Sequence, residues 1–319
     1  FFLPLGLISF KRGRTSRVWL VLPLLLLCDE LRSNFPFGGF GWNRLSFSQA
    51  DAPYRLIASY FGDLSLSAVA ISLGIALYLF FARAQLVSVA LIMLCSTFAI
   101  LLPAQATGQG SARILAIQGN VPQLGLDFNS RAKEVFQMHV KQTNIALSKI
   151  DSKPDAILWP ENAVDVDPFR DPEIFETLNT FTTPLIVGAI VNRDKEILNT
   201  SILWTKEAQN VYVKQHLTPF GEYIPLRSIA SKISPLVDDV RDFSAGNEST
   251  IFTIGAAKIA PIICYELLDD QILQDGAKSS NLLAVQTNSA TFGDSAESAQ
   301  QHGARCAHQG AAGAGVVSP

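Results

Sequence analysis

The chain has 319 residues, of which 48% are hydrophobic and 17% charged, and its mean hydropathy is +0.24. This composition is too apolar for an ordinary soluble enzyme and predicts membrane segments. The net charge of −3, without any block of like charge, argues against a basic surface and against nucleic acid as a partner.

The first third of the chain carries the apolar segments, so residues 1–105 are predicted to form a helical membrane region. The two longest runs have 18 residues each without a charge, which comes close to spanning a hydrocarbon core of about 30 Å. Because the chain begins inside an apolar run and without Met, we expect it to be truncated at its N-terminus. Four spans are predicted, near residues 1–10, 18–35, 64–81 and 85–102.

The orientation of these spans follows from the basic residues between the first two of them. Loops rich in Lys and Arg stay in the cytoplasm. Three crossings from that loop place everything after Pro103 on the extracytoplasmic side. The basic residues of the loop are Lys11, Arg12, Arg14 and Arg17.

A second domain is predicted over residues 111–302, where short β-rich runs alternate with amphipathic stretches, the pattern of a layered α/β domain. Residues 303–319 lack a strand or helix period and are expected to be an aberrant or unstructured tail. Helices are predicted over residues 130–150 and 172–181. Strands are predicted over residues 114–118, 156–159, 185–190, 200–204, 211–213, 258–264 and 282–286.

Three motifs in this domain place a reactive side chain at or just beyond the end of a predicted strand. They are the segments 158–162, 214–223 and 261–266, which contain Glu161, Lys214 and Cys264 respectively. Because α/β sheets gather their sites at strand ends, we expect these three side chains to meet.

The chemistry of the three residues fits acyl transfer. A thiol with an ordinary pKa of about 8.5 needs a base or a cation to attack a carbonyl, and Glu161 and Lys214 supply both. Lys214, with the backbone N–H of Tyr265, would stabilise the oxyanion of a tetrahedral intermediate. Glu222 and Glu266 flank this predicted site.

Each residue also has a plain structural explanation. Cys264 alone is more often a small buried hydrophobic residue, Glu161 could cap a helix, and Lys214 could be a charge at a strand edge. A Cys/His arrangement with His216 is a further alternative, but it leaves Glu161 and Lys214 without a role. The histidines show no zinc-ligand spacing, so neither a metal nor another cofactor is predicted. They are His139, His216, His302 and His308.

Together the motifs resemble the nitrilase (carbon-nitrogen hydrolase) superfamily, whose members use a Glu, Lys, Cys triad in this order on a four-layer αββα sandwich. The preceding membrane spans and the string from Lys214 to Tyr223 resemble the apolipoprotein N-acyltransferase family. The segments 118–123 and 39–42 are similar to that family as well. The resemblance fails after about His302, so it implies a sandwich that is incomplete at the C-terminus.

The resemblance implies a function in the bacterial inner membrane. Cys264 would take a fatty acyl chain from a membrane phospholipid as a thioester. It would then pass the chain to the N-terminal α-amine of a diacylglyceryl-cysteine in a lipoprotein. Glu161 would be the general base and Lys214 the oxyanion stabiliser, with Glu222, Tyr265 and Glu266 in support. The alternatives are a nitrilase-type amidohydrolase, which passes the acyl group to water, and a non-catalytic membrane scaffold that binds lipoproteins.

Overall fold

The structure is a computed structural model, which describes residues 15–82, 84–101, 111–121, 128–206, 209–232, 237, 241–290, 295–297, 299–301, 304 and 315–318. The chain divides into two compact units, and we describe each by itself. The helical unit comprises residues 1–107 and 295–313. The α/β unit comprises residues 108–294 and 314–319.

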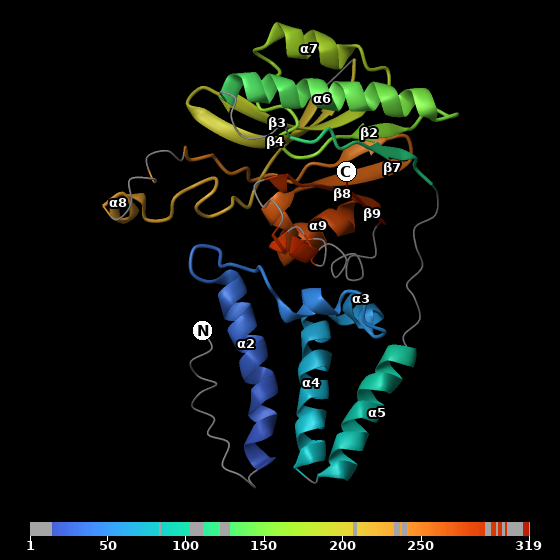
Figure 1. Ribbon diagram of the computed structural model, residues 1–319, viewed down its shortest axis with the longest axis vertical. Coiled ribbons are helices and arrows are strands. Elements are labelled where there is room, and N and C mark those ends of the chain that lie inside the picture. Colours follow the sequence, from blue (N-terminus) through green and yellow to red (C-terminus); the bar gives the residue numbers. More distant parts are fainter. Residues whose placement is uncertain are drawn as a thin grey trace. The chain divides into compact units, whose positions relative to one another are not determined.

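The helical unit is built from apolar helices, and a long loop follows the first of them (Figure 1). A 3-10 helix at Thr15–Leu20 leads directly into α2, and the loop after α2 contains two further 3-10 turns at Leu45–Gln49 and Arg55–Ile57. Side chains from α2 and α4 pack together around Ile71, Ile75 and Leu79. The helices are α2 (Val21–Asn34), α3 (Ala58–Phe61), α4 (Leu64–Phe81) and α5 (Gln85–Leu101).

Three of the four predicted spans coincide with these helices, and the span near residues 1–10 lies outside the described residues. Within the described part of the chain, α4 is the one helix long and apolar enough to cross a membrane, and the run 85–95 of α5 is apolar but shorter. The helix α2 does continue through its charged residues, because Arg32 pairs with Asp29 at 2.6 Å within the helix.

Polar contacts of two arginines fix the loop that follows α2. The guanidinium of Arg32 donates to the carbonyl oxygens of Phe40 at 2.6 Å and Trp42 at 2.5 Å. Arg44 forms a buried ion pair with Asp63 at 3.3 Å. A buried charge is tolerated only when it is paired in this way, so these contacts determine the course of the loop.

The α/β unit contains two sheets. The first has the order β1-β2-β3-β4-β5, with β1, β2 and β3 parallel and β4 and β5 antiparallel to their neighbours. Its strands are β1 (Ile114–Ala116), β2 (Ala156–Leu158), β3 (Leu185–Arg193), β4 (Glu196–Trp204) and β5 (Gln209–Val213). The second has the order β6-β7-β8-β9, and its strands are β6 (Phe252–Ile254), β7 (Ala257–Ile263), β8 (Leu282–Gln286) and β9 (Gly315–Val317).

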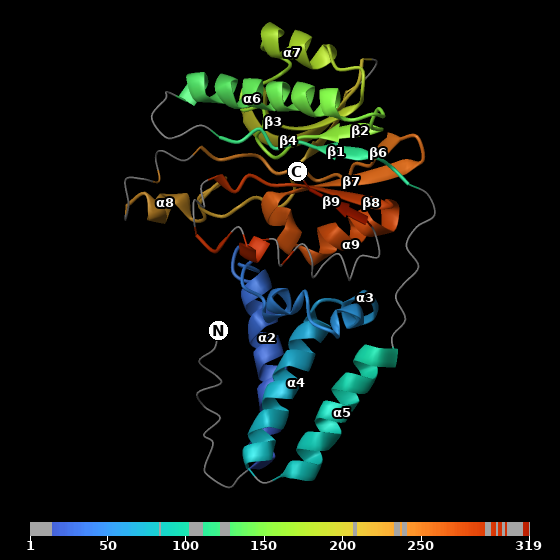
Figure 2. The ribbon, with the colours of Figure 1, turned by 45° about the vertical axis from the view of Figure 1, so that its right-hand side comes forward.

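Helices cover the outer faces of the two sheets (Figure 2). On the first sheet, α6 (Phe128–Lys149) and α7 (Pro172–Asn179) enclose a core around Trp159 and Trp204. The inner faces of both sheets share a second core, which includes Leu158 and Ile259. The helix α9 (Asp270–Ser279) packs on β7 and β8. The predicted α/β class is therefore confirmed.

The structure also contains elements that the sequence analysis did not predict: β6, β9, α9 and the short helix α8 (Arg227–Ala230). The strand β9 corrects the expectation for residues 303–319, because Gly315–Val317 pairs in parallel with β8. This pairing links segments more than 25 residues apart, so no local sequence period could reveal it.

Candidate active site

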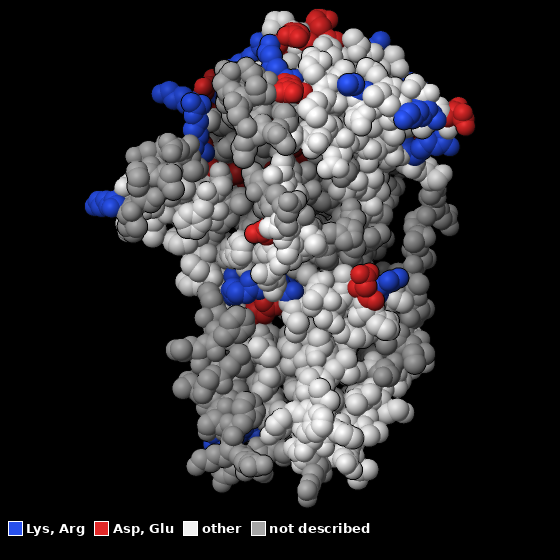
Figure 3. Space-filling model, in the orientation of Figure 1, with Lys and Arg blue, Asp and Glu red and all other residues white. Residues whose placement is uncertain are grey.

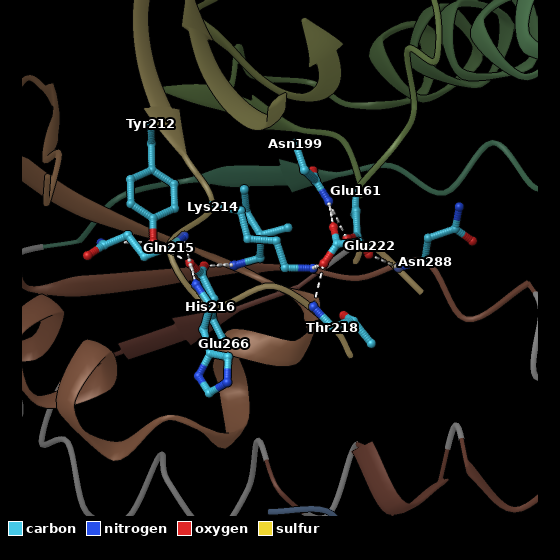
Figure 4. A network of polar contacts seen from close by, with 11 residues as sticks. Glu161, Asn199, Tyr212, Lys214, Gln215, His216, Thr218, Glu222, Glu266 and Asn288 are labelled. Carbon is cyan, nitrogen blue, oxygen red and sulfur yellow. Dashed lines mark hydrogen bonds and ion pairs between the residues drawn. The ribbon is translucent and has the colours of Figure 1, made fainter. Parts of the chain in front are cut away.

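The predicted triad residues come together at the ends of three strands, and Figure 4 shows Glu161 and Lys214 among them. Glu161 lies beyond the end of β2, Lys214 directly after β5 and Cys264 directly after β7. The ammonium of Lys214 lies 3.3 Å from Oε1 of Glu161. Glu161 and Lys214 both lie close enough to Cys264 to shift the pKa of its thiol, Glu161 upward and Lys214 downward. The structure therefore places a thiol, a carboxylate and an ammonium in one cluster, in which Glu161 and Lys214 are buried and Cys264 is partly buried.

Backbone strain accompanies each of the three motifs. Cys264 has a φ of 50°, Asn162 next to Glu161 has 54°, and Phe220 in the segment after Lys214 has 64°. Non-glycine residues rarely occupy this left-handed region, and those that do concentrate at functional sites. At Cys264 the strain comes from a sharp turn in which β7 ends at Ile263 and a 3-10 helix begins at once.

Glu222 is the fourth member of the cluster. Its Oε2 lies 2.8 Å from the ammonium of Lys214 and accepts a hydrogen bond from the backbone N–H of Thr218 at 2.7 Å. Burial alone would raise the pKa of Glu222, but Lys214 and the hydrogen bonds hold it below its ordinary value. Lys214 therefore lies between two carboxylates.

The charge balance of the cluster keeps the cysteine protonated at rest. Burial raises the pKa of the Cys264 thiol, Glu161 raises it further, and Lys214 only partly opposes them. For Lys214, burial would lower the pKa, but Glu161, Cys264 and Glu222 raise it above its ordinary value, so the ammonium is retained. The geometry thus suits a neutral thiol that loses its proton to Glu161 when it attacks, rather than a preformed thiolate.

Glu266 lies behind the cysteine turn and is fully buried. Its Oε1 accepts from the hydroxyl of Tyr212 at 2.7 Å and from the backbone N–H of Gln215 at 2.6 Å, and its Oε2 accepts from the N–H of Ile263 at 2.7 Å. Burial raises the pKa of Glu266, and these donors oppose that rise. One carboxylate thus joins the segment after Lys214 to the turn that holds Cys264.

We expect Glu266→Gln to destabilise the α/β unit by about 1–3 kcal/mol and to lower transfer activity, because the new amide group turns an N–H toward N–H donors. Thermal unfolding followed by circular dichroism measures the first effect. Glu176 on α7 offers a matched control. It is exposed, so Glu176→Gln makes the same chemical change at a position that faces solvent. Equal melting temperatures for the two variants would contradict this role of Glu266.

His216 has partners other than a catalytic thiol. Its Nδ1 lies 2.7 Å from Oδ2 of Asp269, and its ring meets that of Tyr265 edge to face, with centroids 5.2 Å apart. Asp269 also caps α9 by accepting from the N–H groups of Gln271 and Ile272. His216 therefore joins the Lys214 segment to the start of α9.

Gly188 on β3 allows Glu161 to approach the sheet. A Cβ added at Gly188 would lie 2.3 Å from the carbonyl oxygen of Pro160 and 2.7 Å from Cα of Glu161. We expect Gly188→Ala to cost about 1–3 kcal/mol of stability and to displace Glu161, because the clash is with backbone. Thermal unfolding and transfer rates check this, with Gly74→Ala, which meets open space, as the control. Unchanged rates would show that Glu161 tolerates the shift.

Asn199 on β4 belongs to the same network, and the sequence analysis missed it. Its side-chain amide donates to Oε1 of Glu161 at 2.9 Å and to Oε1 of Glu222 at 2.7 Å. The backbone N–H of Asn288 donates to the other oxygen of Glu161 at 3.1 Å. Among the described residues there is no group of three His, Cys, Asp or Glu side chains placed to hold a metal ion.

Comparison with known proteins confirms the resemblance that the motifs indicated. Residues 1–76 match the family model of the apolipoprotein N-acyltransferase N-terminal domain. An apolipoprotein N-acyltransferase of Mycolicibacterium smegmatis is 32% identical over 61% of this chain and 36% of its own length. Those of Methylococcus capsulatus and Shewanella oneidensis are 31% and 26% identical, each over 91% of this chain and 60% of its own. The chain thus spans between about a third and 60% of the length of these relatives.

Solved structures with a similar arrangement include a carbon-nitrogen hydrolase from Helicobacter pylori, with 15% identity and a TM-score of 0.43, covering 62% of this chain and 68% of that one. A CN-hydrolase superfamily protein from Xanthomonas campestris has 15% identity and a TM-score of 0.35, covering 47% and 58%.

Proposed function

We propose that this chain, which is homologous to the apolipoprotein N-acyltransferases, transfers a fatty acyl chain from a membrane phospholipid to the N-terminal α-amine of a diacylglyceryl-cysteine in a lipoprotein. The observation that carries the proposal is the cluster of Glu161, Lys214 and Cys264 at three strand ends. The named relatives support the choice of reaction, since each of them is an apolipoprotein N-acyltransferase.

In the first half of the reaction, Cys264 attacks the ester carbonyl of the phospholipid while its proton passes to Glu161. Lys214 and the backbone N–H of Tyr265 stabilise the negative charge on the carbonyl oxygen. The ester C–O bond then breaks, and the departing alcohol of the lysophospholipid takes the proton from Glu161. A thioester on Cys264 remains.

In the second half, the lipoprotein amine attacks the thioester carbonyl and gives a proton to Glu161. The C–S bond breaks, the sulfur of Cys264 takes the proton back, and an amide has formed. Glu222 would keep Lys214 in place through both halves, because it lies 2.8 Å from the ammonium. Glu266 would hold the turn of Cys264 through the N–H of Ile263.

The helical unit suits substrates that stay in a bilayer. The surface of α4 and α5 exposes large apolar side chains, among them Leu77, Phe81, Leu86 and Met93. The described surface of these helices is nearly free of charge in Figure 3, whereas Lys, Arg, Asp and Glu gather on the α/β unit. Exposed apolar surface of this kind is typical of a lipid contact. We therefore propose a multi-pass bacterial inner-membrane protein whose layered α/β unit is a nitrilase-like αββα sandwich on the extracytoplasmic side.

The test is peptide mass spectrometry after incubation of the protein with phospholipid vesicles. The proposal predicts an acyl adduct on Cys264 that persists in water and is removed by a diacylated lipopeptide with a free amine. An adduct that disappears in water alone would instead favour the amidohydrolase alternative. Transfer to the lipopeptide that needs no adduct would refute the thioester route.

A further inference from the structure

The side chain of Asn199 occupies a position to which the sequence motifs assign no role. It is 2% exposed and lies between the two carboxylates of the cluster. Its amide nitrogen donates to Oε1 of Glu161 at 2.9 Å and to Oε1 of Glu222 at 2.7 Å (Figure 4). One neutral donor thus bridges two groups of like charge.

The backbone fixes this bridge relative to Lys214. The N–H of Lys214 donates to the carbonyl oxygen of Asn199 at 2.9 Å, directly after the paired strands β4 and β5. The amide of Asn199 and the ammonium of Lys214 therefore contact the same two carboxylates from neighbouring strands. Between them they supply two donors to Glu161 and two to Glu222.

We propose that Asn199 is a positioning residue, which holds Glu161 and Glu222 in fixed orientations so that Glu161 faces Cys264 as the base. The proposal rests on the proposed function, because it assigns Asn199 a part in the same reaction. The physical reason is charge. A buried carboxylate, Glu161, and a partly buried one, Glu222, share one ammonium, so a neutral donor that contacts both offsets their repulsion without altering the net charge.

Two variants of Asn199 should respond to pH in opposite directions. Asn199→Ser removes both hydrogen bonds without adding charge. The Asn199 hydrogen bond helps to lower the pKa of Glu222, so without it this carboxylate takes up a proton at higher pH. The transfer rate of Asn199→Ser, relative to the unaltered chain, should therefore fall as the pH falls.

Asn199→Asp has almost the same shape as the native side chain but places a third carboxylate beside Glu161, Glu222, Lys214 and Cys264. At high pH the added charge disfavours ionisation of the thiol, and the relative transfer rate should drop by about a hundredfold. As the pH falls, the cluster takes up one extra proton and regains its original charge. The relative rate of Asn199→Asp should therefore rise as that of Asn199→Ser falls.

The experiment measures transfer rates of the full chain in lipid vesicles between about pH 5.5 and pH 8.5, a range that covers the titration of perturbed carboxylates. Asn210→Asp is the matched control, because Asn210 is exposed on β5 and its replacement adds the same charge to solvent. Near-ultraviolet circular dichroism shows whether each variant is folded. The proposal is supported if the relative transfer rates of the two Asn199 variants change with pH in opposite directions. The rate of Asn210→Asp relative to the unaltered chain should stay the same at every pH. Parallel profiles for folded variants overturn it.

A second measurement separates this proposal from the proposed function. The rate of alkylation of Cys264 by iodoacetamide, followed on its peptide, does not depend on any acyl substrate. Asn199→Asp should slow alkylation at least about tenfold near pH 8, and the difference should shrink as the pH falls. If the unaltered chain transfers no acyl group but alkylation follows this pattern, the proposed function fails and the placement of Asn199 stands. Unchanged alkylation in folded Asn199→Asp overturns the placement itself.

Discussion

Replacement of Cys264 by alanine is expected to abolish the acyl adduct and to lower the rate of transfer by about 10⁴-fold or more. The sulfur is the atom that would carry the acyl chain, and the cluster around it contains no second thiol among the described cysteines, since Cys28 and Cys95 lie in α2 and α5. Without the thioester, Glu161 and Lys214 could only assist a direct attack by the amine. Intact-mass and transfer assays on the same preparation measure both effects.

Alanine is a fair substitution at this position because it keeps the β-carbon that the left-handed backbone of Cys264 already accommodates. The variant should therefore melt close to the unaltered chain. Cys95→Ala removes a cysteine from α5 and should leave both adduct and transfer intact. If Cys264→Ala kept its transfer activity while folded, the chain would act as a scaffold or use another nucleophile.

The convergence of Glu161, Lys214 and Cys264 could be expected from the sequence, because each lies in a short contiguous motif at a strand end. Glu161 follows a buried apolar strand, and Cys264 follows another. Such signals are local, and the general rule that sites form at strand ends brings them together. The roles of these residues remain predictions, although their convergence is now a structural observation.

Asn199 could not be found in the same way. It lies inside an ordinary buried strand, and its importance arises only when β4 pairs with β5 and places it beside Lys214. The strand β9 was missed for a similar reason, since its three residues depend on pairing with β8. The helix α9 did carry a local signal, because Asp269 precedes it and caps its N-terminus through Gln271 and Ile272.

Replacement of Lys214 by methionine should destabilise the protein by about 3–5 kcal/mol, since it leaves the buried Glu161 and the partly buried Glu222 without a cation. Lys214 is 1% exposed and lies 3.3 Å from Glu161 and 2.8 Å from Glu222. Methionine has a similar length, so the loss reflects charge more than packing. Transfer should fall as well, because the oxyanion loses its main positive neighbour. Thermal unfolding of the unaltered chain and of Lys214→Met at several pH values measures the stability change.

The pH dependence of this loss has a definite sign. In the unaltered chain Lys214 helps to lower the pKa of Glu222, so this carboxylate adds stability above its unfolded pKa of about 4.3, and that stability is lost as the pH falls through the folded value. In Lys214→Met burial raises the folded pKa instead, so stability is retained at low pH and declines as the pH rises past about 4.3. The difference between the two melting temperatures should therefore widen from acidic to neutral pH.

Lys133→Met, which removes an exposed lysine beside Asp171 and Glu173, should show no such widening. A constant difference for Lys214→Met would mean that the ammonium of Lys214 does not hold Glu222 in its ionised form.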